Sequence, residues 1–185
     1  MRAISGFIIL VAAMFAVMAM PPSPLESSVA HNSPFIYTGD GKIKITDTHT
    51  GETITILYRD PDGFYRDEAL TAIDHTLRCH GGGERFPISL KLVELIDNVQ
   101  DHFNAESVRV VSGYRSFEYN SALKRRLSRV AHNSLHIQGM AADIAIPGVS
   151  KHELAKYARS LATGGVGTYA GSDFVHIDVG PVRTW

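Results

Sequence analysis

Residues 134–144 read SLHIQGMAADI, and they place a histidine and an aspartate close together in the chain. Small residues between His136 and Asp143 leave space beside both side chains. Imidazole and carboxylate groups are common ligands of divalent metal ions. The segment DIAI (143–146) alternates, with two isoleucines on one side of a strand and Asp143 on the other. The stretch therefore predicts a polar loop leading into a strand, with one candidate metal ligand on each.

A second candidate strand, FVHIDV (174–179), alternates in the same way. Its valines and isoleucine share one face and predict core positions, whereas His176 and Asp178 share the face that would look into a site. His136, Asp143 and His176 would supply three N/O ligands and leave a tetrahedral position for water, as in catalytic zinc sites. A strand histidine is also a common hydrogen-bonded structural residue, so the residues alone leave both interpretations open.

Elsewhere the chain mixes helical patterns with short strands, without a repeating βαβ order. Alternation around a DTHTG turn predicts an N-terminal β-hairpin over residues 42–58. Apolar spacing and capping residues predict four helices and two further strands. The helices are 66–79, 88–103, 116–127 (capped by Ser116) and 150–161, and the strands are 107–112 and 164–169. The class expected is α+β, an antiparallel sheet flanked by helices.

Length and composition limit the possible functions. A chain of 185 residues suggests one domain with its own core. Its net charge of −1 indicates no basic surface for binding nucleic acid or anionic lipids. We also expect the protein to be a monomer. The single cysteine, Cys79, excludes an intrachain disulfide framework and a Cys-rich zinc module, and we expect it to be a small buried hydrophobe.

The N-terminal segment has the layout of a signal peptide. Arg2 precedes an apolar run and a Pro-rich break, and residues 28–30 (SVA) offer a small-x-small cleavage site. Residues 1–30 therefore predict export to the periplasm or cell envelope. Since residues 3–25 carry no charge, an uncleaved inner-membrane anchor is the alternative. Residues 31–41 are a polar linker before the domain at 42–185.

Four segments carry a resemblance to a known family. They are SGYRS (112–116), SLHIQGMAADI (134–144), GGVGTY (164–169) and SDFVHIDVGPVRTW (172–185). Together they resemble the zinc D-Ala-D-Ala carboxypeptidase family and, within it, the murein endopeptidase K (YcbK-like) subgroup. The resemblance covers residues 41–185, including the hairpin ending THTGE. It implies the hedgehog/D-Ala-D-Ala peptidase fold and a Zn²⁺ ion held by His136, Asp143 and His176.

The resemblance also implies a general acid/base at Asp173, three residues before His176. A zinc ion lowers the pKa of its bound water to about 7, and a nearby carboxylate can take that proton. From the residues alone, a turn aspartate before a strand is the preferred interpretation of Asp173. On a regular strand it would face away from the metal, so the chain must bend near Phe174. Many relatives have a histidine where Phe174 stands.

Three further residues receive roles with open alternatives. Arg115 corresponds to the family arginine that holds a substrate carboxylate or peptide oxygen, and its alternative is a surface salt bridge. Ser134 either hydrogen-bonds substrate or caps a loop. Asp178 either orients His176 or is a solvated or salt-bridged strand carboxylate.

Other histidines are given no site role. His75, Cys79 and His80 are close in sequence, but no acid or second cysteine completes a metal site there. The sequence around His49 is polar, which predicts that His49 lies on the surface.

The function expected is a zinc metallopeptidase that hydrolyses peptide crosslinks between peptidoglycan stem peptides. The alternatives are a D-Ala-D-Ala type carboxypeptidase and a zinc-binding, non-catalytic wall-binding or scaffold domain. Asp173 and Arg115 favour an enzyme over a scaffold. A loop that closes the groove beyond the cleaved bond would decide between endopeptidase and carboxypeptidase, and a single sequence does not show one.

Overall fold

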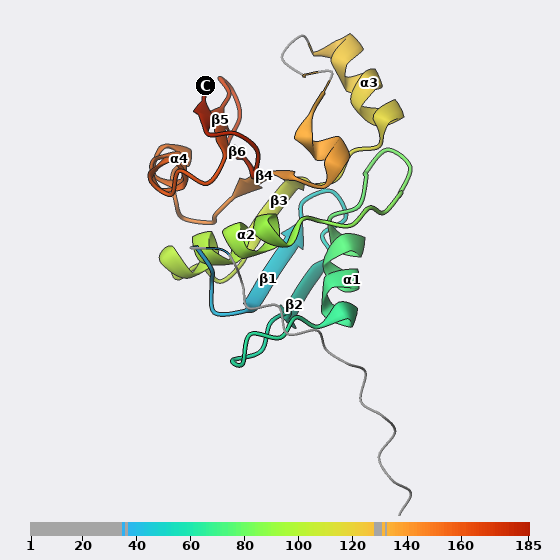
Figure 1. Ribbon diagram of the computed structural model, residues 1–185. Coiled ribbons are helices and arrows are strands. Elements are labelled where there is room, and N and C mark those ends of the chain that lie inside the picture. Colours follow the sequence, from blue (N-terminus) through green and yellow to red (C-terminus); the bar gives the residue numbers. More distant parts are fainter. Residues whose placement is uncertain (1–34, 36, 128–130, 132) are drawn as a thin grey trace, which may run out of the picture.

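A seven-stranded sheet in the order β2-β1-β3-β4-β6-β5-β7 forms the centre of the protein (Figure 1). The computed structural model describes residues 35, 37–127, 131 and 133–185, so the predicted signal peptide lies outside the described residues. The strands are β1 Lys42–Asp47, β2 Thr53–Leu57, β3 Val108–Ser112, β4 Ala141–Ala145, β5 Gly165–Thr168, β6 Val175–Asp178 and β7 Arg183–Thr184.

Helices flank this sheet, which confirms the predicted α+β class. They are α1 Asp67–Thr76, α2 Leu90–His102, α3 Phe117–Arg126 and α4 Lys151–Ser160, with a short 3-10 helix, η1, at Leu135–Gln138. The sheet is mostly antiparallel, as predicted, and the N-terminal hairpin pairs β1 with β2. Two pairs, β1–β3 and β5–β7, are parallel. β1 and β3 can be parallel because α1 and α2 lie between them in the chain and provide the crossover.

Two predicted helix caps are present. The hydroxyl of Ser116 accepts a hydrogen bond from the backbone N–H of Tyr119 at 3.3 Å. Ser150 and Glu153 form a reciprocal capping box at the start of α4. These side chains satisfy N–H groups that have no partner inside the helix, so they fix where α3 and α4 begin.

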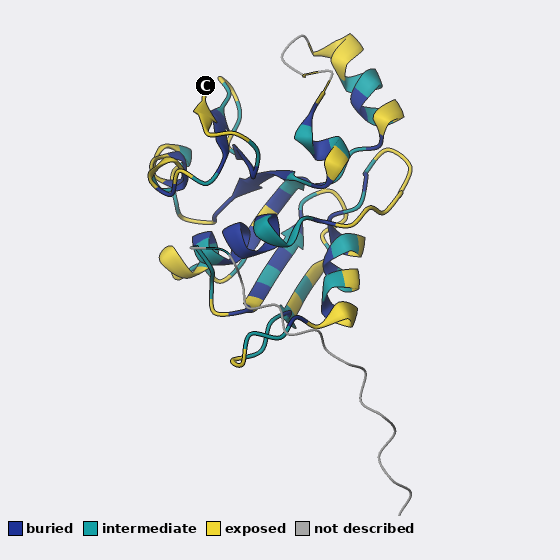
Figure 2. Cartoon of the chain, viewed as in Figure 1, coloured by how far each residue is buried: buried dark blue, intermediate teal, exposed yellow. Residues whose placement is uncertain are grey.

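The hydrophobic core lies between the sheet and three of the helices (Figure 2). Helix α1 contacts β2, α2 contacts β1, and α4 contacts β5 and β6. The predicted aliphatic face of β6 is buried in this core, through Val175, Ile177 and Val179. Packing this face inward directs the opposite face of β6, which carries His176, away from the core.

Helix α3 projects beyond the end of the sheet, away from the other helices (Figure 1). Its buried residue is Asn120, whose amide donates to the carbonyl of Ala131 at 3.1 Å. Because α3 does not cover the core, it is placed to form one wall of a cavity at that end of the sheet.

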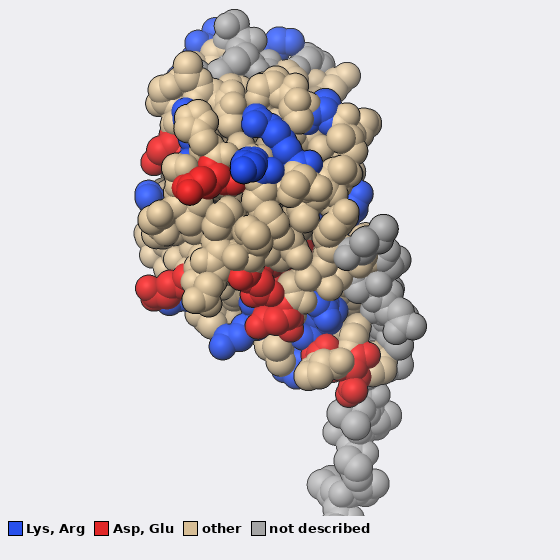
Figure 3. Space-filling view, turned by 90° about the vertical axis from the view of Figure 1, so that its left-hand side faces the viewer, with Lys and Arg blue, Asp and Glu red and all other residues tan. Residues whose placement is uncertain are grey.

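Charged side chains of both signs are interspersed on the face shown in Figure 3, in small groups. This distribution agrees with the near-zero net charge of the chain. Within the described ranges, none of the helices combines the length and apolar character that crossing a membrane requires.

Candidate metal centre

Two of the candidate ligands face each other across neighbouring antiparallel strands. Asp143 in β4 is paired with His176 in β6, so their side chains leave the same face of the sheet at the same level. The prediction placed both residues on site-facing positions of their strands, and the register brings them together.

The third candidate ligand, His136, comes from the 3-10 helix η1. Ser134 caps η1, since its hydroxyl accepts from the backbone N–H of His136 at 3.4 Å. Gly139 ends η1 with φ +62, where a side chain would be strained, and a Cβ there would lie 2.3 Å from the carbonyl oxygen of Pro87. The small residues in SLHIQGMAADI thus let the chain turn sharply from His136 into β4.

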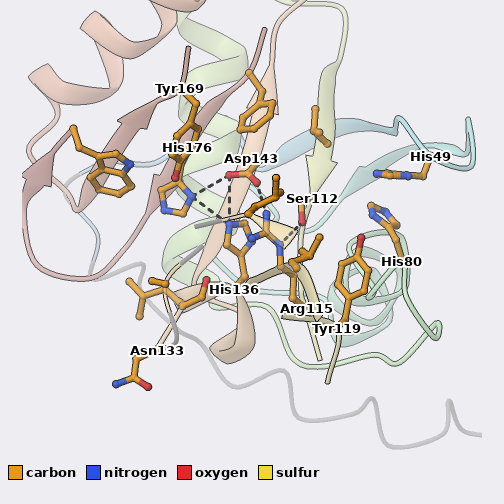
Figure 4. Close-up of a pocket in the computed structure, with 18 of the residues that line it drawn as sticks. His49, His80, Ser112, Arg115, Tyr119, Asn133, His136, Asp143, Tyr169 and His176 are labelled. Carbon is orange, nitrogen blue, oxygen red and sulfur yellow. Dashed lines mark hydrogen bonds and ion pairs between the residues drawn. The ribbon is translucent and has the colours of Figure 1, made fainter. Parts of the chain in front are cut away.

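The three side chains converge on one point (Figure 4). His176 Nδ1 lies 3.0 Å from Asp143 Oδ1, and His136 Nε2 lies 3.2 Å from His176 Nδ1. His136 Nε2 is 3.4 Å from Asp143 Oδ1. All three residues are buried. Two imidazole nitrogens and one carboxylate oxygen at these separations form a candidate metal centre.

Each of these side chains is held from behind by a second group. His136 Nδ1 donates to the carbonyl of Gly113 at 2.7 Å, and a neutral ring then has its lone pair on Nε2. His176 Nε2 donates to Asp178 at 3.1 Å, which leaves the lone pair of the neutral ring on Nδ1. Arg115 donates to Asp143 Oδ2, leaving Oδ1 directed at the centre. The three lone pairs therefore point toward one another, the arrangement that a cation requires.

Asp178 connects the centre to the C-terminal residues. The Arg183 guanidinium donates to its carboxylate at 2.7 Å, and the backbone N–H groups of Gly165 and Gly180 donate at 3.0 and 2.9 Å. Burial raises the pKa of Asp178, but the hydrogen bond from His176, those from the two backbone N–H groups and the charge of His176 outweigh it and lower the pKa to about 2. Asp178 is thus a firmly ionised acceptor behind His176.

Electrostatics distinguish the two imidazoles when no ion is bound. Burial lowers the pKa of His136. For His176, burial acts in the same direction, but hydrogen bonds to Asp143 and Asp178 outweigh it and raise the pKa. Burial raises the pKa of Asp143, yet the neighbouring histidines and Arg115 hold it below its usual value. Asp143 is therefore a carboxylate, and a metal ion would displace a proton held by His176.

The other predicted site residues divide into two groups. Arg115 and Ser134 line the cavity beside the metal centre. Arg115 is also bonded to Ser112, through Nε at 2.8 Å, so it holds Asp143 rigidly. Asp173 lies in a bend before β6, where the chain turns as predicted, but its side chain is exposed and is not part of the described cavity lining.

The cavity has a volume of about 480 Å³, and some of the residues that line it were assigned no role from the sequence. His49 and His80 line it on the β1 side, Tyr119 on α3, and Arg183 and Trp185 at the C-terminus. Trp185 packs over Gly167, where a Cβ would lie 2.4 Å from the ring. His49, Arg183 and Trp185 lie in the THTGE turn and the C-terminal VRTW, which are part of the family resemblance. Neither segment has a residue spacing that would by itself have indicated a site.

Two imidazoles and a carboxylate, buried at the edge of a cavity in an α+β fold, are a donor set of the kind found in catalytic zinc sites. Residues 38–185 match the family described as peptidoglycan L,D-endopeptidase MepK, and the chain belongs to this family. The peptidoglycan L,D-endopeptidase MepK of Escherichia coli (strain K12) is 33% identical, over 90% of this chain and 88% of its own length. The probable peptidoglycan L,D-endopeptidase MepK of Haemophilus influenzae is 39% identical, over 87% of this chain and 89% of its own length.

Proposed function

We propose that the protein is a zinc-dependent peptidoglycan endopeptidase that hydrolyses peptide crosslinks between stem peptides. The observation that carries the proposal is the convergence of His136, Asp143 and His176 in a chain of this family. Relatives named as peptidoglycan L,D-endopeptidases align with this chain over 88% and 89% of their own length, which supports the proposal.

Zinc is supported by the donor set and its spacing. Zinc–nitrogen and zinc–oxygen distances of about 2.0–2.1 Å in a tetrahedron put neighbouring ligand atoms about 3.3 Å apart. The three donor atoms here are separated by 3.0, 3.2 and 3.4 Å. Three protein ligands also leave the fourth position that catalytic zinc sites keep open. Zinc bound there supplies a Lewis acid and an activated water at neutral pH.

Residues of the chain itself then act on the peptide. Arg115 and Ser134, which line the cavity, are proposed to bind carbonyl or carboxylate oxygens of the substrate. In the same proposal, Asp173 accepts a proton from the attacking water and delivers it to the departing amine. Its exposed side chain lies in the bend that precedes β6, the strand that carries His176.

Replacing Asp178 by Asn should weaken metal binding roughly 10- to 100-fold, the usual cost of losing a group that orients a ligand. Asn keeps the shape but removes the charge that His176 and Arg183 share. Competition with a chromophoric chelator measures the affinity. Asp62→Asn, an exposed turn substitution, is the matched control. Unchanged affinity in Asp178→Asn would show that Asp178 does not support the ligand.

Digestion of purified, crosslinked peptidoglycan tests the function directly. The protein should convert muropeptide dimers to monomers, and a chelator should stop this conversion until zinc is restored. Release of free D-alanine without loss of dimers would indicate a carboxypeptidase instead. No product of either kind from the zinc-loaded protein would indicate a non-catalytic wall-binding domain.

A peptidoglycan substrate supports a location in the cell envelope, and we propose export through residues 1–30. Mass spectrometry of the protein recovered from cells separates cleavage after Ala30 from retention of the segment as an anchor. An intact, cytosolic chain would contradict export.

A further inference from the structure

A second group of ionisable side chains lines the same cavity, apart from the metal centre. His49, in the turn between β1 and β2, and His80, beyond α1, have ring centroids 3.9 Å apart. Behind them, at the end of β1, lies Asp47, which is 1% exposed. Figure 4 shows the two rings on the far side of Arg115 and Tyr119 from His176.

Asp47 fixes the orientation of His80. One of its oxygens accepts from the backbone N–H groups of His49 and Thr50 at 2.7 and 3.2 Å, and the other accepts from His80 Nε2 at 2.9 Å. Burial raises the pKa of Asp47, but these hydrogen bonds and the charge of His80 outweigh it, so the pKa is lowered. With Nε2 used in this way, Nδ1 is the nitrogen of His80 that remains for a ligand in the cavity.

The distance of this pair from the metal centre fits an extended peptide. Asp47 is paired with Val110 on β3, and Asp143 is paired with Ser112, two residues further along β3. Two strand spacings and two residues of rise put Asp47 and Asp143 roughly 12 Å apart. An extended chain covers this distance in three to four residues. Because His80 is hydrogen-bonded to Asp47, the pair lies near the point that a group three to four residues from the cleaved bond would reach.

The cavity wall around His80 suits an anionic group. Apart from Asp143, which belongs to the metal centre, the described lining contains no carboxylate that would repel one, and its arginines, Arg115 and Arg183, are paired with Asp143 and Asp178. A protonated imidazole donates from both nitrogens. With Nε2 donating to Asp47, Nδ1–H of His80 would donate to a ligand carboxylate, and the ring would lie between two negative groups.

We propose that His80, oriented by Asp47 and packed against the tilted ring of His49, binds a carboxylate of the stem peptide some three residues from the cleaved bond. This inference rests on the proposed function for the identity of the peptide. Binding can nevertheless be measured without turnover, so the two proposals fail separately.

The test is a double-mutant cycle between protein and ligand, measured by calorimetry on the zinc-loaded protein. The probes are the tripeptide L-Ala-γ-D-Glu-meso-diaminopimelic acid and its singly amidated forms, each with one carboxylate neutralised. His80→Gln is the informative variant, because the Gln amide can still donate to Asp47 but offers no group in place of Nδ1. His75→Gln, an exposed histidine of α1, is the control.

We expect one amidation to weaken binding to the wild type by roughly 10- to 100-fold, the range for a hydrogen bond between charged groups. His80→Gln should lose a similar factor and no longer distinguish that amidated peptide, while His75→Gln should behave as the wild type. In the unaltered protein, the tripeptide should also shift the ¹⁵N resonance of His80 Nδ1. Additive effects of the variant and the amidation, an unshifted resonance, or no binding of any peptide would each overturn the proposal.

Discussion

Alanine at His136, Asp143 or His176 should abolish crosslink cleavage and lower zinc occupancy in each case. Each side chain supplies one of three donor atoms that lie 3.0–3.4 Å apart, and two donors hold zinc far more weakly than three. Metal analysis after dialysis measures occupancy, and muropeptide separation measures cleavage. His152→Ala, an exposed histidine on α4, should leave both unchanged.

Loss of activity alone would not identify the ligands, since removing a buried side chain can also destabilise the fold. Asp143→Ala in particular leaves the Arg115 guanidinium without its carboxylate. The stabilising effect of added zinc on thermal unfolding is therefore the second measurement. It should be present in the wild type and reduced in each variant that folds, because metal binding is linked to folding. Full zinc occupancy in all three variants would rule out this triad.

The sequence predicted the faces of the strands well, because a two-residue period is a local property. Alternation in FVHIDV assigned Val175, Ile177 and Val179 to the core, and the structure places all three there. The same period put His176 and Asp178 on the opposite face, where a hydrogen bond now joins them. The caps at Ser116 and Ser150 were also predicted from local spacing.

The sequence could not predict contacts between distant segments. The pairing of Asp143 with His176 depends on strand register, and the bond from His136 to the Gly113 carbonyl involves a backbone atom that every residue has. His80 was assigned no role because its partner, Asp47, is far away in the chain. The two residues come together only in the folded protein, where Asp47 ends β1. Such pairings follow from tertiary packing rather than from any local pattern.

Asparagine at Asp173 should keep zinc bound and lower the rate of crosslink cleavage by a factor of ~100 to 10,000, the usual contribution of a positioned proton-transfer group. The amide keeps the size of the side chain but cannot accept a proton from the attacking water. Asp173→Ala should lose a similar factor. Because Asp173 is exposed and outside the metal ligands, neither change should alter zinc occupancy or the melting temperature by much.

The contrary outcome is equally informative, since Asp173 lies in a bend and asparagine serves bends as well as aspartate does. Near-wild-type cleavage by Asp173→Asn would show that Asp173 is a turn residue and would end its assignment as the base. Asp178, the carboxylate bonded to His176 Nε2, is poorly suited to take over. Its oxygens already accept from His176, Arg183 and two backbone N–H groups, and its pKa of about 2 makes it a weak base. A proton acceptor would then have to come from the cavity wall itself, and the Asp173→Asn rate decides whether one is needed.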